Sequence, residues 1–181
     1  MRLIKERIEK QLEVRTEEVF QRFTPFVTRG TDFKKFKGEG FADVGDFDVL
    51  AYWPATNTLA VVECKYNQPP FSVKDSRRLR DRIFGKDETD RTGQFSCIAR
   101  RRAFVKEHRG RMLELLKWPP AEVDESRDVE MYVSRDLHWW MVHPPYPVPT
   151  FFVAVDSLDI WLKDQAWLGM RDAEALPALI R

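Results

Sequence analysis

Two neighbouring apolar stretches carry the strongest structural signal in this 181-residue chain: residues 45–51 read Gly-Asp-Phe-Asp-Val-Leu-Ala, and residues 61–65 read Val-Val-Glu-Cys-Lys. The segment 54–58 between them, Pro-Ala-Thr-Asn-Thr, has the composition of a turn. Apolar runs of this length on either side of a turn predict a β-hairpin. We expect its strands to cover residues 45–53 and 59–66.

Both predicted strands contain charged residues. Residues i and i+2 of a strand point to the same face, so Glu63 and Lys65 project together while Cys64 points to the opposite side. Asp48 lies close to them if the strands pair in an antiparallel hairpin. Charges in such apolar strands need compensation. The sequence therefore predicts a carboxylate–carboxylate–ammonium cluster at the open end of the hairpin, where a divalent metal ion is the natural fourth partner.

Three other interpretations of this cluster stay open. Asp46 shares a strand face with Asp48, so either aspartate can be the principal ligand; the apolar run directly after Asp48 favours Asp48. A cross-strand salt bridge on a solvated face is possible, although the apolar flanks disfavour it. The Asp46-Phe47-Asp48 triplet also matches the Asp-x-Asp metal motif of some glycosyltransferases, for which this chain is short.

The rest of the chain predicts helices and strands in alternation, and thus an α/β fold in which a central mixed β-sheet is flanked by helices. We expect helices at 3–23, 73–84 and 94–117, strands at 129–134, 138–142 and 150–155, and a short helix from Ser157 to about Trp167, with another short helix at the end of the chain. The glycine-containing segment 30–45 is expected to be loop or weak strand. One domain spanning residues 1–181 is the simplest organisation for this length.

Composition narrows the functional class. No apolar run approaches the roughly 18 residues of a transmembrane helix, so no membrane association is expected. The N-terminus lacks the features of a secretory signal, and the two cysteines show neither metal-ligand nor disulfide spacing, so a cytoplasmic location is expected.

Basic residues are concentrated locally although the net charge is only +1. They outnumber acids in the segments 74–82 and 100–111. Such a surface suits a phosphate backbone, although part of it is also consistent with a solvated helix face. The residues we expect to contact nucleic acid are Lys74, Arg77, Arg78, Gln94, Arg101, Arg102 and Lys106. Trp139 and Trp140 are candidates for stacking on unpaired bases, or equally for packing in the sheet or a dimer contact.

The combination of a glutamate-bearing first helix, Gly-Asp-x-Asp-Val-Leu-Ala and Val-Val-Glu-Cys-Lys resembles the PD-(D/E)xK nuclease superfamily, in particular its Mrr-like and archaeal Holliday-junction-resolvase-like branches. The resemblance covers residues 10–110, with 129–181 as additional C-terminal strands and helices. Phe47 stands where the family often has proline. The resemblance implies a restriction-endonuclease-like fold and a Mg²⁺-dependent DNA endonuclease, in which Mn²⁺ can substitute.

The resemblance also implies residue roles. Asp48, Glu63 and the Cys64 carbonyl would bind the metal ion, and Lys65 would orient the attacking water, stabilise the transition state or act as the base. The first helix of the family often supplies a further acid, for which Glu17 and Glu18 are the candidates, with Glu17 preferred. A homodimer or a larger defence or repair assembly is expected. The alternative is a nucleic-acid-binding or assembly module without catalysis.

Overall fold

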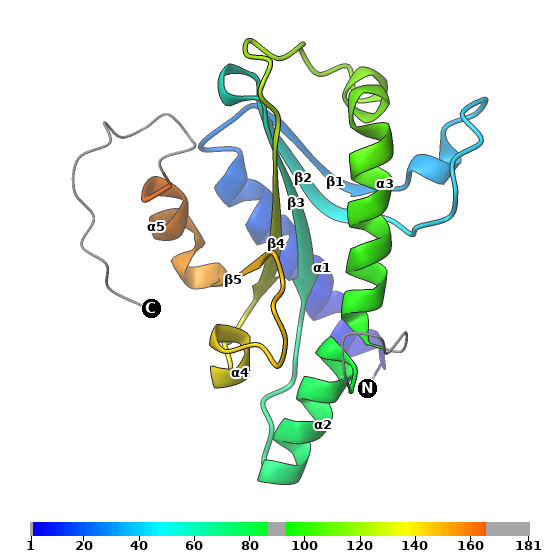
Figure 1. Ribbon diagram of the computed structural model, residues 1–181. Coiled ribbons are helices and arrows are strands. Elements are labelled where there is room, and N and C mark those ends of the chain that lie inside the picture. The colour runs from blue at the N-terminus through cyan, green and yellow to red at the C-terminus, as the bar shows by residue number, and fades with distance from the viewer. Residues whose placement is uncertain (1, 87–92, 166–181) are drawn as a thin grey trace.

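A five-stranded mixed β-sheet forms the centre of the protein (Figure 1). The computed structural model describes residues 2–86 and 93–165. The strands are β1 (Phe26–Thr31), β2 (Phe47–Trp53), β3 (Thr58–Lys65), β4 (Arg127–Ser134) and β5 (Thr150–Ala154), in the spatial order β1-β2-β3-β4-β5. The β1–β2 and β2–β3 pairs are antiparallel, and the β3–β4 and β4–β5 pairs are parallel. The predicted α/β architecture with a mixed sheet is confirmed.

Helices cover both faces of this sheet (Figure 1). They are α1 (Arg2–Phe20), α2 (Val73–Phe84), α3 (Gln94–Leu115), α4 (Trp139–Val142) and α5 (Leu158–Lys163), with short 3₁₀ turns at Phe33–Lys35, Pro54–Thr56 and Val155–Ser157. Helices α1 and α5 lie on one face and α3 lies on the other. Every residue of β2 is consequently buried, which explains why its sequence is a nearly continuous apolar run.

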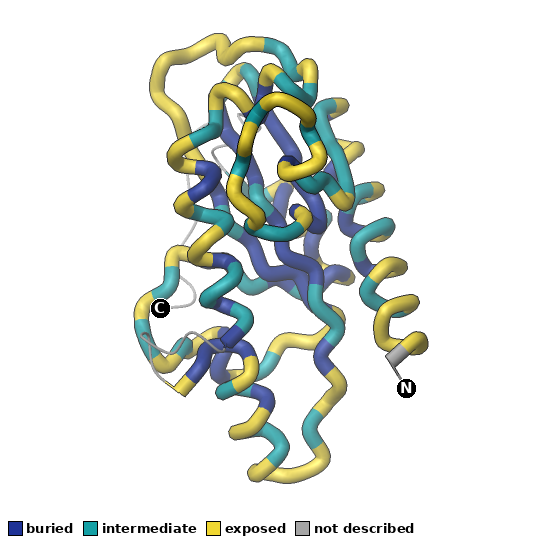
Figure 2. The backbone as a smooth tube through the Cα atoms, turned by 90° about the vertical axis from the view of Figure 1, so that its right-hand side faces the viewer, coloured by how far each residue is buried: buried dark blue, intermediate teal, exposed yellow. Residues whose placement is uncertain are grey.

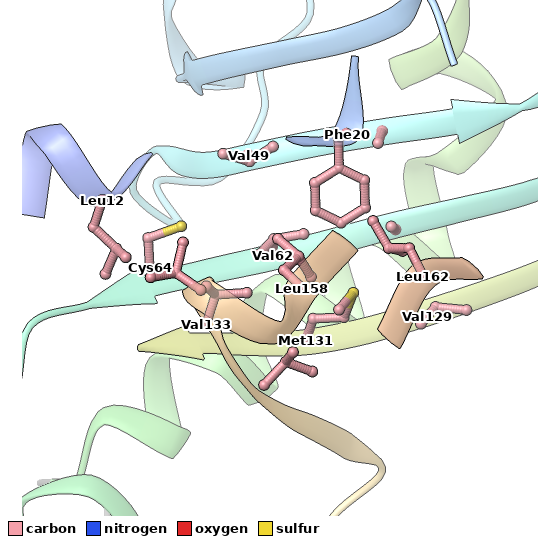
Figure 3. Packing of buried hydrophobic residues seen from close by; sticks show 14 of the residues in the cluster. Leu12, Phe20, Val49, Val62, Cys64, Val129, Met131, Val133, Leu158 and Leu162 are labelled. Atoms are coloured by element: carbon pink, nitrogen blue, oxygen red, sulfur yellow. The ribbon is translucent and has the colours of Figure 1, made fainter. Parts of the chain in front are cut away.

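The alternation of side chains along β3 divides the core into two layers. Val62 and Cys64 point toward α1 and α5, where Phe20 and Leu158 pack against them (Figure 3). Leu59, from the other set of alternating positions, packs with side chains of α3. This alternation places Glu63 and Lys65 on the α3 face, with Cys64 on the α1 face, as the sequence predicts.

A third apolar cluster joins α2, α3 and α4 near one end of the sheet. It is centred on Tyr132 of β4, Phe84 of α2 and Trp140 of α4. The segment that follows β3, together with α2, extends past this end of the sheet, and its tip is exposed (Figures 1 and 2). No helix within 2–86 and 93–165 is both long and apolar enough to cross a bilayer.

The sequence predicts loop or weak strand after the first helix, and the structure has a strand there, whereas the strand expected at 138–142 is wrong. In both places neighbouring structure outweighs local pattern. Residues 26–31 form the strand β1, which pairs only with β2; an edge strand needs few apolar residues, and Gly30 interrupts its pattern with a φ of 62°. Residues 139–142 form helix α4 rather than a strand. There Trp140 is buried against Phe84, whereas Trp139 is 68% exposed. Helix α5 ends at Lys163, and the expected last helix lies outside the described residues.

Candidate active site

Strand pairing brings the predicted carboxylates together at the open end of the β2–β3 hairpin. Val49 of β2 pairs with Val62 of β3, so Asp48 comes next to Glu63 one residue further along. The connecting turn, Pro54–Thr56, lies at the opposite end of the hairpin. Asp48 and Glu63 are both buried, with 5% and 8% of their surface exposed. Two carboxylates at this depth require cationic or hydrogen-bonding partners.

The ammonium of Lys65 provides the first of these partners. Its Nζ lies 2.9 Å from Asp48 Oδ2, 2.8 Å from Glu63 Oε1 and 3.2 Å from the carbonyl oxygen of Cys64. Three oxygens thus converge on one position that holds a positive charge. Asp48 Oδ2 also accepts a hydrogen bond of 2.7 Å from the Cys64 backbone N–H, which satisfies a donor where the strand ladder ends.

Arg101 of α3 is the second cationic partner. Its Nη1 donates to Glu63 Oε2, and its guanidinium lies 5.9 Å from the centroid of the Phe47 ring. The Nε of Arg101 is buried and has no hydrogen-bond partner in the part of the chain that the structure describes. Glu63 therefore binds a different cation with each carboxylate oxygen, and Arg101 retains one buried donor whose hydrogen-bonding capacity is unused within the described residues.

Burial and charge shift the proton affinities of this cluster in different directions. Burial raises the pKa of Glu63, and the neighbouring charge of Asp48 raises it further, against the opposing effect of Lys65 and Arg101. Burial alone would lower the pKa of Lys65, but the charges of Glu63 and Asp48 outweigh it and raise the pKa above its usual value. Lys65 is thus an ammonium at neutral pH in this arrangement, which is a donor and not a base.

Three acids of the first helix differ in their surroundings, and Glu13, which Lys10 binds at 3.0 Å, joins Glu17 and Glu18 as a candidate. Glu17 binds Arg29 of β1, with 2.9 Å between Oε2 and Nε, and Glu18 is exposed. Glu13, one turn before Glu17, is half-buried; burial raises its pKa, and the charge of Asp48 contributes to the shift. The signal that could have identified Glu13 is the buried stripe Leu12, Thr16 and Phe20, beside which it lies.

The geometry also shows which of the two aspartates, Asp46 or Asp48, belongs to the carboxylate cluster. Asp46 precedes β2 and is exposed, whereas Asp48 is buried and contacts Lys65 and Cys64. Asp48 is therefore the aspartate that belongs to the cluster.

The predicted nucleic-acid-binding residues fall into two groups. Lys74, Arg77 and Arg78 on α2 and Lys106 on α3 are exposed. The other three residues, Arg101, Arg102 and Gln94, contact other parts of the protein. Arg102 donates from Nε and Nη2 to the Glu130 carboxylate of β4 at 2.7 and 2.8 Å. The Oε1 of Gln94 accepts a hydrogen bond of 2.8 Å from the Tyr132 hydroxyl. The contact with Glu130 assigns Arg102 a part in joining α3 to the sheet.

The residues of the cluster match the donor set of a hard divalent cation in kind. Mg²⁺ takes oxygen ligands and often binds one or two carboxylates while keeping waters, and Asp48, Glu63 and the Cys64 carbonyl offer such oxygens around one position. Occupation of that position requires Lys65 to move aside. Within the described ranges, no group of three or more His, Cys, Asp or Glu side chains is arranged to hold a metal ion.

Searches of protein-family models, curated proteins and solved structures found no significant match to this chain.

Proposed function

We propose that this protein is a metal-dependent deoxyribonuclease that hydrolyses phosphodiester bonds at the Asp48–Glu63–Lys65 cluster. The observation that carries the proposal is the convergence of three oxygens, from Asp48, Glu63 and the Cys64 carbonyl, within 3.2 Å of one ammonium nitrogen. The similarity of the two sequence stretches to the PD-(D/E)xK superfamily, and their pairing as an antiparallel hairpin, support the same assignment.

The residues of the cluster have distinct tasks in this proposal. Asp48 and Glu63, with the Cys64 carbonyl, would hold Mg²⁺ or Mn²⁺. Such an ion would lower the pKa of a bound water and neutralise charge on the phosphate. Lys65, moved aside from the two carboxylates, would donate hydrogen bonds to the water or to a phosphate oxygen. The free Nε–H of Arg101 is a second donor for a phosphate oxygen.

A nucleic acid is the preferred substrate class because exposed cations lie on the two helices that follow the cluster, and the resemblance to the PD-(D/E)xK superfamily implies DNA. Lys74, Arg77 and Arg78 on α2 and Lys106 on α3 can contact a phosphate backbone, which positions a substrate without selecting a sequence. A homodimer or a larger assembly stays a prediction, based on the need to cut two strands with one cluster per chain.

One observation favours a second candidate function. Lys65 and Arg101 already neutralise Asp48 and Glu63 without a metal ion, so the cluster can also serve as a buried ion-pair network in a nucleic-acid-binding or assembly module. The two candidates differ in one measurable property: a binding module associates with DNA with a steep salt dependence but does not cleave it in any metal ion.

The test is cleavage of supercoiled plasmid, linear duplex, single-stranded and four-way-junction DNA in Mg²⁺, Mn²⁺ or EDTA. We expect cleavage in either metal ion and none in EDTA, and the preferred substrate then identifies the DNA structure recognised. Absence of cleavage of all four substrates, together with the absence of metal binding by calorimetry, would overturn the proposal in favour of the binding module.

A further inference from the structure

The segment between β3 and α2 builds a second site, apart from the carboxylate cluster. Residues 67–84, which we call the protrusion, extend past the end of the sheet at which β3 ends (Figures 1 and 2). At its tip Phe71 is 86% exposed and Val73 is 72% exposed, and Phe71 is the most exposed aromatic side chain in the described part of the chain.

A hollow of about 280 Å³ lies between the extended segment and α2. Its volume is close to the lower limit of sites for small ligands, about 300 Å³. One wall consists of prolines and the Phe71 ring, and the other carries guanidinium groups; the lining residues are Gln68, Pro69, Pro70, Phe71, Asp75, Arg78, Leu79 and Arg82. The hollow thus combines an apolar face with positive charge.

The charge on the protrusion is largely uncompensated. Lys74, Arg77 and Arg82 form no ion pair within 2–86 and 93–165, and Arg78 only approaches Asp75 at 3.9 Å. Asp75 itself is held by Ser72, which donates to its Oδ2 at 2.7 Å. Lys74, Arg78 and Arg82 recur every four residues and therefore line one side of α2, next to the buried side chains of Leu79 and Ile83. A partner of this surface must be anionic and must offer a flat apolar group.

We propose that the protrusion binds an unpaired nucleotide of a DNA strand, with its base stacked on Phe71 and its phosphates on Arg78 and Arg82. Unpaired bases have the exposed π-face that an aromatic side chain needs, whereas the bases of an intact duplex are stacked on one another. The inference rests on the proposed nuclease function and specifies its substrate as single-stranded DNA or DNA with an unpaired segment.

The test is the affinity of fluorescent single-stranded and blunt, fully paired duplex oligonucleotides, measured by anisotropy in EDTA so that cleavage plays no part. Phe71→Ala should weaken single-strand binding about fivefold or more and leave duplex binding nearly unchanged. Its salt dependence should stay that of the wild type. The double variant Arg78→Gln/Arg82→Gln should instead reduce the salt slope by about 1.4, because each lost phosphate contact on a single strand contributes roughly 0.7.

Control variants are Ile160→Ala on α5 and Lys37→Gln, both exposed residues outside the protrusion, and neither should change binding. Unchanged single-strand affinity in Phe71→Ala, or an equal loss for the duplex, would overturn the inference while leaving the nuclease proposal intact. A wild-type protein that binds neither oligonucleotide yet cleaves plasmid would also overturn this inference alone. If the wild-type protein neither binds the oligonucleotides nor cleaves DNA, both this inference and the nuclease proposal would be overturned.

Discussion

At the level of single residues, the ammonium of Lys65 lies where a metal ion would bind in the proposed site. Replacement of the ammonium by a metal ion can therefore be measured. Lys65→Met removes the ammonium and leaves Asp48 and Glu63 facing each other. We expect the free energy of unfolding to fall by about 2–3 kcal/mol, less than for a fully buried pair because Lys65 is partly exposed. Mg²⁺ should then raise the melting temperature of the variant more than that of the wild type. Equal Mg²⁺ responses in thermal denaturation would contradict this assignment.

Arg101 and its neighbour Arg100 offer a matched comparison on one helix. Arg101→Gln leaves Glu63 with one cation and should lower the free energy of unfolding by about 1–3 kcal/mol. Arg100 is exposed, so Arg100→Gln should stay within about 0.5 kcal/mol of wild type. Urea denaturation measures both values. A similar effect of the two substitutions would show that the Glu63 contact contributes little.

The two-residue repeat of side-chain direction along a strand explains why the clustering of Asp48, Glu63 and Lys65 could be predicted from sequence. Their mutual placement needs only the hairpin and the rule that residues two apart share a face. The role of Arg101 could not be predicted in this way, because its contact with Glu63 joins residues 38 positions apart and depends on how α3 is rotated about its axis. Its charge alone predicts a phosphate contact for Arg101, whereas the structure places its guanidinium against the Glu63 carboxylate.

At the level of elements, α1 decides which acid approaches the cluster. Glu13 and Glu17 lie one turn apart; Arg29 binds Glu17 at 2.9 Å, and Lys10 binds Glu13 at 3.0 Å. If Glu13 is the helix acid of the site, Glu13→Gln should lower the cleavage rate about tenfold or more, whereas Glu17→Gln should leave it nearly unchanged. Single-turnover cleavage in Mg²⁺ measures both rates, and the reverse order would restore Glu17 to the site.

His138, which precedes α4, gives a prediction for pH. Burial lowers the pKa of its imidazole, which stacks on Trp140 at 4.9 Å between ring centroids. Below about pH 6.5 the unfolded chain therefore binds more protons at this residue than the folded protein does, so stability falls as pH falls. Between pH 7.5 and 5.0, wild type should lose more stability than His138→Gln in urea denaturation. An equal or smaller loss in wild type would contradict the shift.

The elements that the sequence predicted well are those whose signals are local. Helix α2 has the expected bounds, because Ser72 caps its first turn and Gly85 follows its last residue. The sequence leaves the region of β1 open between loop and weak strand and predicts a strand in place of α4, since β1 is defined by its pairing with β2, and α4 by the burial of Trp140 beneath α2. Both depend on contacts between distant parts of the chain.

On the scale of the whole molecule, the fold places its two candidate sites in succession along the chain. β3 ends at Lys65 in the carboxylate cluster, and the protrusion follows directly, so a strand held by Phe71 and the arginines of α2 would be directed along the same end of the sheet. The tertiary arrangement therefore places the basic residues of α2, which the sequence shows only as a local excess, at the end of the sheet where β3 ends.

The most direct measurement of the central claim is the rate of Mg²⁺-dependent plasmid cleavage by Asp48→Asn and Asp46→Asn, two isosteric substitutions two residues apart. The amide introduced by Asp48→Asn keeps an oxygen that can accept from the Cys64 N–H, so the fold should be preserved, which circular dichroism can verify. We predict that Asp48→Asn lowers the rate about a hundredfold or more, while Asp46→Asn stays within about twofold of wild type. Equal rates in the two variants would contradict the assignment of the cluster as the catalytic centre.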